Sequence, residues 1–452
     1  MSLKSKIHQQ QFALKLPRDL GDGLVLRLTT PDDAESLAQF SGRVFGRDNK
    51  IDEIAMLYTR DMMRELHPII GPANTFIVED TRTPGKIVST MCLIPQTWTY
   101  AGIPFGVGRP EMVATDPDYR RRGLVRAQFE VVHALSESLG HLMQGITGIH
   151  WYYRQFEYEY ALDLGGGRIA YFSNVPTLKE NESEPFRVRA ATFDDIPLLS
   201  AVYDRECARS LVACPRSSEL WRYQLEPQSA AMAWRAPYHI IETNDGRAVG
   251  YVQASRDIWL DAIVLSELAV AEGQSMRAVM PSILRWAKTV GESEAIKQEK
   301  TVKGIYLSFG REHPAYDAIP DLLPRTRIPY GWYIRVPAVP QFIRHIAPAL
   351  EKRLAQSVMA GHTGELKISE YRRGCKIVFE NGKLTNVEAW QPMPSDEGDC
   401  GFPPLVFLQL LFCRKSLLEL REAFADVWAK DDAAPLLDAL FPKMFSCVNC
   451  VS

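Results

Sequence analysis

An internal repeat constrains the fold of this chain more than any other feature of its sequence. Residues 25–34 are echoed by residues 187–196. In each copy an alternating strand pattern leads to an Asp-Asp pair, and aspartates at this place cap the start of a helix. The chain has 452 residues, too many for one domain. We therefore expect two copies of one α/β unit.

The repeat continues through a hairpin and a strand-to-helix connection. Residues 76–90 and 239–251 each have the pattern of two strands joined by a turn, and Asp245-Gly246 is a strong turn pair. Residues 265–270 then form an apolar strand pattern that leads into a helical pattern at 276–286. The two copies together fill most of residues 24–310.

The stretch from residue 110 to residue 126 carries the clearest chemical signal. A short apolar strand ends at Thr115, a turn and three arginines follow, and after Gly123 a helix is predicted to run to about Leu139. A helix N-terminus offers unpaired N–H groups and the positive end of the helix dipole. Because Gly123 lacks a Cβ, the backbone there can approach a diphosphate closely. An anion site is therefore predicted at this corner.

The second copy lacks this basic corner. After residue 270 it continues through Glu272, Gly273 and Ser275 to its helix, with no run of arginines. We infer that only the first copy binds a cofactor and that the second is structural.

A third region follows the proline-rich break at residues 337–340. It is predicted to contain a helix at about 341–360, a strand at 365–371, and a hairpin across Asn381-Gly382. Apolar helical stretches follow at 403–412 and 434–442. The expected domains are a lead-in at 1–23, two repeated units at 24–180 and 181–336, and a third domain at 337–452.

Composition excludes several classes of protein. The net charge of −3 and the pI near 6.3 argue against a surface for nucleic acid. We see neither an apolar run of 18 residues nor a signal peptide, so we expect a soluble, cytoplasmic chain with no membrane span. The 8 cysteines do not form a disulfide framework. Cys447 and Cys450 lack the second pair that a zinc site needs, so no metal is expected.

The basic corner resembles the coenzyme A signature of the GNAT N-acetyltransferases, Arg/Gln-x-x-Gly-x-Gly/Ala. Arg120 and Gly123 match it, whereas Val125 stands where a small residue is usual. The resemblance implies acetyl-CoA as co-substrate, with its diphosphate on residues 120–125, which are Arg120, Arg121, Arg122, Gly123, Leu124 and Val125. Met112 and Val113 would offer main-chain groups to the pantetheine arm.

The hairpins and apolar helices of residues 337–452 resemble a sterol-carrier-protein-like domain. The resemblance lies in residues 407–412 and 437–442. Two GNAT-like copies followed by such a domain resemble the enhanced-intracellular-survival (Eis) family of N-acetyltransferases. The implied fold class is α/β (α+β): tandem GNAT-like mixed sheets with flanking helices, then a sterol-carrier-like α+β domain. The family implies acetylation of amines, some of them aminoglycosides, and assembly as homo-oligomers, specifically hexamers.

Catalytic residues are predicted from residues 150–160. GNAT enzymes have a tyrosine five residues before an aromatic residue and a glycine before that aromatic residue. Tyr153 and Tyr158 fit this pattern, with Glu157 where glycine is usual. A phenol within reach can protonate the departing thiolate, so Tyr153 is the predicted general acid. Tyr152 is the second choice.

The general base is left open by the sequence. The proton of the amine can go to a carboxylate, a water chain, or the chain-terminal carboxylate that the Eis resemblance suggests. Glu111, on the strand that should face the thioester, is one candidate, and His150 is a possible relay. The predicted function is direct acetyl transfer to a primary amine of a small molecule or peptide. The alternative is a non-catalytic acyl-CoA- or lipid-binding protein.

Overall fold

The computed structural model describes residues 13–48, 50–64, 67–226 and 236–451. They form two compact units. The first contains the described residues up to 162 together with 332–444, and the second contains residues 163–331 together with 445–451. Mixed sheets flanked by helices build both units, which confirms the predicted α/β fold class. No helix among the described residues has both the length and the apolar character to cross a membrane.

The large sheet of the first unit surrounds the central hairpin of β4 and β5. Strands β1 to β5 pair antiparallel with their sequence neighbours, and β5 pairs with β6 in parallel. In sheet order the strands are β1 (Arg18–Asp19), β2 (Leu24–Leu28), β3 (Thr75–Asp80), β4 (Lys86–Tyr100), β5 (Ile103–Thr115), β6 (Met143–Ile146), β16 (Tyr330–Arg335) and β7 (Glu159–Leu164).

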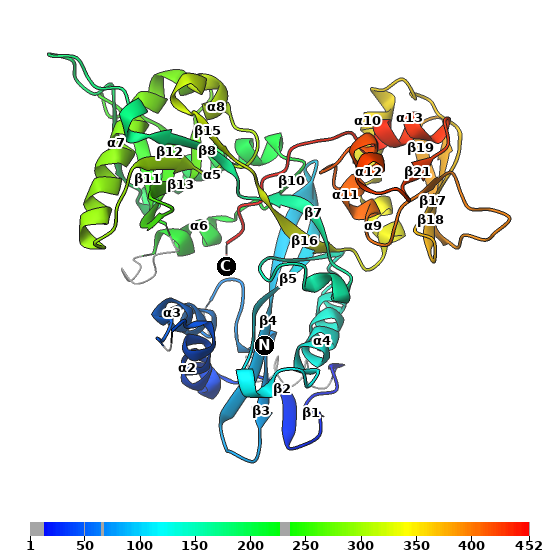
Figure 1. The fold of residues 1–452 in the computed structure, drawn as a ribbon. Helices are drawn as coiled ribbons and strands as arrows, with labels where there is room; N and C mark the ends of the chain where they lie inside the picture. The colour runs from blue at the N-terminus through cyan, green and yellow to red at the C-terminus, as the bar shows by residue number, and fades with distance from the viewer. Residues whose placement is uncertain (1–12, 49, 65–66, 227–235, 452) are drawn as a thin grey trace. The chain divides into compact units, whose positions relative to one another are not determined.

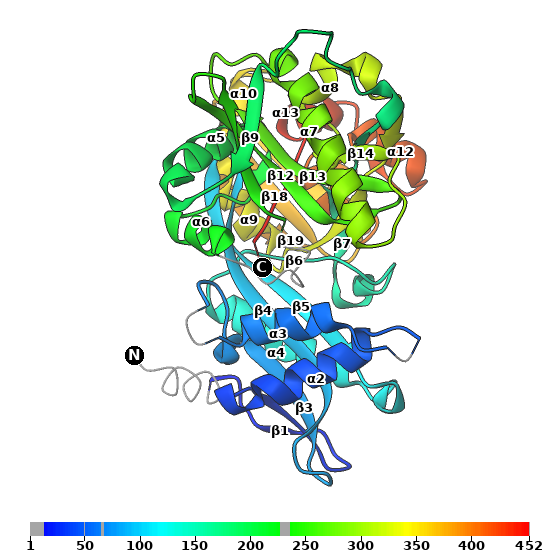
Figure 2. The same ribbon diagram turned by 90° about the vertical axis from the view of Figure 1, so that its left-hand side faces the viewer.

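Helices cover both faces of this sheet. Helices α2 (Ala34–Phe45) and α3 (Glu53–Met62) lie on one face and α4 (Leu124–Ser138) lies on the other (Figures 1 and 2). The alternation of side chains along β4 explains the two cores. Met91 packs with Val132 of α4, whereas the adjacent Cys92 packs with Met62 of α3. Helix α4 agrees closely with the helix predicted from Gly123 to Leu139.

The second unit repeats this plan. Its sheet has helix α7 (Met276–Lys297) on one face and helices α5 (Ile196–Arg209) and α6 (Ser218–Leu225) on the other. In sheet order the strands are β15 (Arg325–Arg327), β8 (Gly167–Tyr171), β14 (Gly304–Leu307), β13 (Ala262–Val270), β12 (Ala248–Trp259), β11 (Tyr238–Thr243) and β9 (Phe186–Ala190). β8 lies before residue 180, where the first copy was predicted to end. The domain boundaries remain predictions.

The repeat extends to individual side chains. In the first unit, Arg27 pairs with Asp33 at 2.8 Å and with Glu79 at 2.9 Å. In the second unit, Arg189 pairs with Asp195 at 2.8 Å and with Glu242 at 2.7 Å. Each aspartate also completes a capping box with the threonine three residues before it. The predicted duplication is thus present in the folded chain down to its helix caps.

Residues 336–444 form a third sheet within the first unit. Its strands are, in order, β19 (Lys383–Trp390), β18 (Gly374–Glu380), β17 (Gly364–Ser369), β20 (Cys400–Gly401) and β21 (Trp428–Ala429). The helices of this region are α9 (Val339–His345), α10 (Ala347–Ala355), α11 (Phe407–Leu411), α12 (Leu417–Ala423) and α13 (Ala433–Leu440).

Two expectations for this third region can be compared with its elements. The hairpin across Asn381-Gly382 is present as β18 and β19. The single helix expected at 341–360 is two helices, because the chain bends at Ile346 and Pro348 follows. A proline inside a helix removes a main-chain donor and clashes with the preceding turn, so it suits the first turn of a new helix.

Candidate active site

Strand β5 is distorted where the sequence placed the thioester. Thr90 of β4 lies opposite Ala114, but Cys92 lies opposite Glu111, so Met112 and Val113 together oppose one residue of β4. This is a β-bulge, a feature that commonly re-aims a strand beside a functional site. Met112 has a φ of +53°. A residue other than glycine adopts this left-handed backbone conformation only at some cost in energy.

Strands β5 and β6 separate next to this bulge. Their parallel register contains only two pairs, Val107 with Met143 and Gly108 with Gln144. Beyond Gly108, β5 continues to Thr115 without pairing to β6. Main-chain groups of β5 on that side therefore face an opening in the sheet. Holding an extended ligand through main-chain hydrogen bonds would need such an opening, and the roles of Met112 and Val113 in it remain predictions.

The basic corner follows directly after β5. Helix α4 begins at Leu124, and its N-cap residue Gly123 has a φ of +76° and offers no side-chain cap. A Cβ at Gly123 would meet no atom within 4 Å, so the left-handed backbone is the reason for glycine here. Because no side chain occupies this helix end, its N–H groups are available to an anion.

The arginines of this corner differ in what they contact. Arg122 stacks on Tyr119 with 4.9 Å between its guanidinium carbon and the ring centroid. Arg126 lies 5.3 Å from the centroid of the Phe156 ring and donates to Gln155 at 3.3 Å. Arg120 and Arg121 are exposed, and Arg121 has a φ of +64°. The corner thus presents several cationic side chains around one helix N-terminus.

A pocket of about 600 Å³ joins the corner to the opening in the sheet. It includes five of the predicted diphosphate residues and one predicted pantetheine residue. Its wall also includes residues that the sequence did not single out, from the end of α2 and from the segment after β6. The lining residues are Val44, Phe45, Val113, Ala114, Thr115, Tyr119, Arg120, Arg121, Gly123, Leu124, Val125, Arg126, Ile149, Tyr152, Gln155 and Phe156.

Four of the predicted site residues do not line this pocket: Glu111, Met112, Arg122 and Tyr153. Met112 packs beside Cys92 in the core under α3. Glu111 accepts a hydrogen bond from Arg109 at 3.0 Å and keeps 27% of its side chain exposed. The structure therefore brings together five of the six predicted diphosphate residues and Val113, whereas the two predicted catalytic residues are not part of the pocket lining.

Tyr153 lies in the aromatic core beneath the pocket and is only 3% exposed. Its ring packs edge-on against Phe129 and Tyr333, with centroids 6.0 and 5.3 Å apart. Burial raises the pKa of Tyr153 above its usual value, and the negative charge of Glu111 raises it further. The phenol therefore stays protonated at neutral pH, as a hydrogen-bond or proton donor must.

Tyr152 lies on the pocket wall next to Tyr153, with 5.3 Å between the ring centroids. Burial also raises the pKa of Tyr152, while the positive charge of Arg126 lowers it. The chain forms a single 3₁₀ turn at this place, Tyr153–Phe156. Adjacent residues of such a turn point in different directions, and of the two phenols Tyr152 lines the pocket and Tyr153 does not.

Glu157 ends this turn in a left-handed conformation, with φ 68° and ψ 27°. This explains why glycine is usual at the position in the family that the sequence resembles. Here the glutamate side chain contacts Arg335 at 3.2 Å and Arg373 at 3.7 Å. His150, the possible relay, is exposed. The terminal Ser452 lies outside the described residues.

The cysteines give no indication of a metal centre. All 8 are free thiols. In the part of the chain that the structure describes, no three His, Cys, Asp or Glu side chains gather in a way that could hold a metal ion.

Comparison with known proteins identifies the class of domain that carries this pocket. Residues 25–161 match the family model described as an acetyltransferase (GNAT) domain. That segment contains β5, the basic corner, α4 and the turn with Tyr153. GNAT enzymes use an acyl-CoA such as acetyl-CoA and act on amines, so the match supports acyl transfer in general. No curated protein sequence matches the chain.

Solved structures share the fold over nearly the whole chain. A conserved protein from Enterococcus faecalis V583, described as a probable N-acyltransferase, is 13% identical with a TM-score of 0.62, over 95% of this chain and 100% of that chain. A GCN5-related N-acetyltransferase from Kribbella flavida is 17% identical with a TM-score of 0.62, over 94% and 97%. Eis1 from Mycobacterium abscessus is 15% identical with a TM-score of 0.56, over 94% and 98%. At these identities the likeness concerns the fold alone.

Proposed function

We propose that this protein is an acetyl-CoA-dependent N-acetyltransferase that moves an acetyl group to a primary amine of a small molecule or peptide. One observation carries the proposal. The uncapped basic helix end at Gly123 opens into a pocket of about 600 Å³ that reaches the β-bulge of β5. A diphosphate, an extended pantetheine arm and a thioester need these three features in this order.

The chemistry follows from a direct transfer. The neutral amine nitrogen attacks the thioester carbonyl carbon, the C–S bond breaks, and the products are an amide and coenzyme A. The leaving thiolate takes a proton from Tyr153, which its buried environment keeps protonated. The amine gives up its proton to a base. Glu111 is our candidate because its carboxylate is close enough to Tyr153 to influence the pKa of that phenol.

Tyr152 is a competing candidate for the acid. It lines the pocket, whereas the Tyr153 ring lies behind it. Protonation by Tyr153 therefore requires that the sulfur atom sits at the depth of the β-bulge rather than at the pocket surface. Residues Arg120, Arg121, Gly123, Leu124 and Val125, which line the pocket, would hold the diphosphate. Arg122, which stacks on Tyr119 and does not itself line the pocket, would act with them.

The finer features of the proposal come from the Eis resemblance. We propose a homo-oligomer, a hexamer in that family, that acts in the cytoplasm, with residues 337–452 forming a sterol-carrier-like domain. Light scattering on the purified chain would measure the oligomer directly. A hexamer supports this part of the proposal and a monomer contradicts it.

A thiol-release assay tests the function itself. Purified protein, acetyl-CoA and a panel of polyamines, aminoglycosides and lysine peptides should release coenzyme A with at least one amine, and mass spectrometry should find the acetylated product. Binding of acetyl-CoA by calorimetry, with no release above the hydrolysis background for any amine, would contradict the enzyme.

One observation favours the non-catalytic alternative enough to keep it. Residues 336–407 enclose a second pocket of about 420 Å³, whose wall is largely apolar but includes Arg344 and Arg373. Such a pocket suits a small amphiphilic ligand. An acyl-CoA- or lipid-binding protein would retain bound lipid or acyl-CoA in mass spectra of the native protein, with no turnover in the amine panel.

A further inference from the structure

The second unit contains a cleft at the place that corresponds to the pocket of the first. Strands β13 and β14 pair in parallel from Ala262 with Gly304 to Leu265 with Leu307, and then they separate. A cavity of only about 50 Å³ remains beyond this point, lined by residues 266–268 of β13 and by residues after β14. Its remaining walls come from α5, from Ser210 and Tyr251, and from residues 445, 447 and 449 of the C-terminal segment, residues 445–451.

The C-terminal segment is held in this cleft mainly through its own main chain. The N–H of Leu211 donates to the carbonyl of Phe445 at 2.8 Å. The hydroxyl of Ser210 accepts from the N–H of Cys447 at 2.7 Å and donates to its carbonyl at 3.5 Å. Two residues further along, the carbonyl of Asn449 accepts two side-chain hydrogen bonds.

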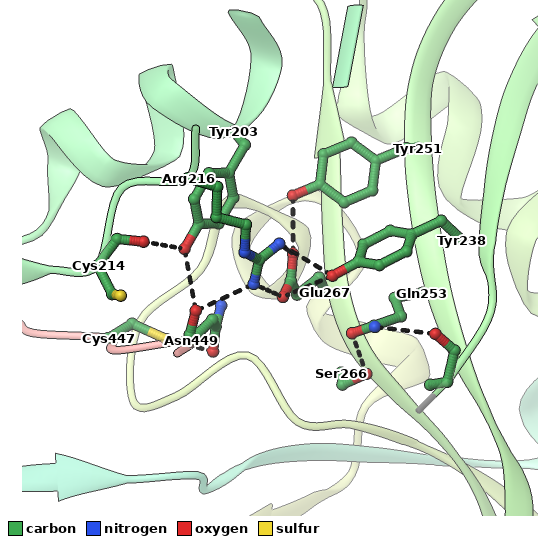
Figure 3. A network of polar contacts seen from close by, with 11 residues as sticks. Tyr203, Cys214, Arg216, Tyr238, Tyr251, Gln253, Ser266, Glu267, Cys447 and Asn449 are labelled. Carbon is green, nitrogen blue, oxygen red and sulfur yellow. Dashed lines mark hydrogen bonds and ion pairs between the residues drawn. The ribbon is translucent and has the colours of Figure 1, made fainter. Parts of the chain in front are cut away.

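Arg216 and Tyr203 provide these last two bonds, at 3.0 and 3.2 Å from the Asn449 carbonyl oxygen (Figure 3). The Arg216 guanidinium is buried, forms an ion pair with Glu267, and lies 4.1 Å from the centroid of the Tyr203 ring. A buried guanidinium needs hydrogen-bond acceptors for its N–H groups. The tail carbonyl is one of these acceptors.

The hydrogen bonds to the tail's main chain described above involve residues 445, 447 and 449, and the same residues line the cavity. The intervening Ser446 accepts a hydrogen bond from the N–H of Val212 through its side chain, at 3.3 Å. A spacing of two is the period of an extended chain, in which every second residue faces the same side. The cleft therefore contacts an extended backbone, and most of its hydrogen bonds go to main-chain atoms that any peptide possesses. Extended peptides are recognised in this way, with main-chain hydrogen bonds supplying affinity.

We propose that this cleft is a binding site for an extended peptide, and that its resident ligand is the chain's own C-terminal segment, residues 445–451. The second unit has thus not merely lost a cofactor site. It uses the opening between two diverging strands to bind a polypeptide and so fixes residues 445–451. This inference does not depend on the acetyltransferase proposal.

A cleavable full-length chain tests the proposal. A protease recognition sequence between Met444 and Phe445 would allow the tail to be cut after folding. We expect the cut tail to remain bound during gel filtration and to exchange with a fluorescent peptide of residues 445–452, measured by anisotropy. Immediate loss of the tail, with no binding of the fluorescent peptide at millimolar concentration, would overturn the proposal.

Two serine variants supply a matched comparison in the same assay. Ser210→Ala removes the hydroxyl that accepts from the N–H of Cys447 and donates weakly to its carbonyl, so peptide affinity should fall about five- to tenfold, the usual effect of losing one good and one weak hydrogen bond. Ser266→Ala removes a hydroxyl of the same cavity that donates to Gln253 at 2.8 Å. It should leave peptide affinity unchanged. Equal effects of the two variants would contradict the proposed contacts.

Hydrogen exchange on the uncut chain gives a second test should the cleavable chain fail to fold. The amides of residues 445–451 should be protected in the wild-type protein and exchange about five- to tenfold faster in Ser210→Ala. They should keep their protection in Ser266→Ala. A tail that exchanges at the rate of an unfolded peptide in the wild-type chain would show that the cleft does not bind it.

Discussion

The strand-to-helix corners of the two repeated units differ in whether a side chain caps the N-terminus of the helix. At the first corner, α4 has Gly123 as its N-cap and no side-chain cap, with arginines before it. At the second corner, the Ser275 side chain accepts a hydrogen bond from the N–H of Ala278 at 3.2 Å. A capped helix end has fewer free donors for an anion. In the same fold, therefore, the presence or absence of a single capping side chain decides whether the N–H groups at this helix end are free to bind an anion.

The clefts beyond the two corners differ in the same sense. Both units let a parallel strand pair separate, but the first leaves a pocket of about 600 Å³ and the second a cavity of about 50 Å³. In the second unit the C-terminal segment fills the space, and His313 Nε2 donates to the carbonyl of Leu268 at 3.0 Å. The duplicated scaffold is conserved within the chain, while its two openings have different occupants.

The largest expected effect concerns the proposed proton donor of the first unit, which the second unit is not expected to have. Tyr153→Phe keeps the ring and its packing but removes the donor, so turnover should fall by about 10²-fold or more while acetyl-CoA affinity barely changes. Steady-state kinetics with a responsive amine, alongside calorimetry, measures both quantities. Tyr152→Phe is the control and should have a much smaller effect.

The opposite ranking of these variants would assign the acid to Tyr152, which lines the pocket. Full turnover in Tyr153→Phe, with chemistry limiting the rate, would show that another group or water protonates the thiolate. Loss of folding in both variants would show that the two rings serve only as core.

The next effect concerns the two corners directly. Gly123→Asp should raise the dissociation constant of acetyl-CoA by about tenfold or more, because it places bulk and negative charge against the diphosphate. Gly273→Asp is a matched control, since Gly273 shares a φ of +76° with Gly123 and its Cβ would also meet no atom within 4 Å. It should leave the affinity unchanged.

Calorimetric stoichiometry completes this test. One acetyl-CoA per chain is expected, because only the first corner is uncapped and basic. Two sites per chain, or equal losses of affinity in the two glycine variants, would show that the second corner also binds coenzyme A.

Local features of this site could be predicted from the sequence. Helix α4, the basic corner and the duplicated Asp-Asp caps depend on short runs of residues whose preferences agree with one another. The left-handed Glu157 was visible only as a departure from a family pattern. Its conformation follows from the turn that it ends, which no side-chain preference of glutamate indicates.

Non-local features could not be predicted in this way. Val44 and Phe45 reach the pocket from the end of α2, far away in the sequence. Tyr152 and Tyr153 differ by one residue, and which of them is buried depends on the packing of Phe129 and Tyr333. The placement of residues 445–451 in the second unit likewise rests on contacts with residues more than two hundred positions earlier. Patterns along the chain contain no signal for such contacts.

A smaller effect tests whether the matching Arg–Asp pairs of the two copies contribute equally to the free energy of unfolding of their units. Asp33→Asn and Asp195→Asn each remove a carboxylate that pairs with an arginine and completes a capping box, so each should destabilise its unit by about 1–2 kcal/mol at neutral pH. Denaturant unfolding monitored by hydrogen exchange would report the two units separately. A clear loss in only one unit would contradict the equivalence of the copies.

The same pair predicts a pH dependence. The hydrogen bond from Arg189 holds the pKa of Asp195 below its usual value. A carboxyl whose pKa is lower in the folded state stabilises the fold above its unfolded pKa of about 3.9, and this contribution is lost as the pH falls further. The difference between wild type and Asp195→Asn should therefore be constant near neutrality and shrink below about pH 4. A difference that persisted unchanged into acid would show that the charge of Asp195 is not its cause.

The smallest expected effect concerns the turn that follows Tyr153. Glu157 has a φ of 68°, so Glu157→Gly relieves a backbone strain while it removes the contacts with Arg335 and Arg373. Exposed ion pairs of this kind contribute about 0.2–1 kcal/mol each, and the glycine gains about the same amount. The melting temperature should therefore hardly change. Glu157→Ala loses the same contacts and keeps the strain, so it should be about 1 kcal/mol less stable than Glu157→Gly. If the alanine variant is the more stable of the two, the left-handed conformation does not determine which residue this turn prefers.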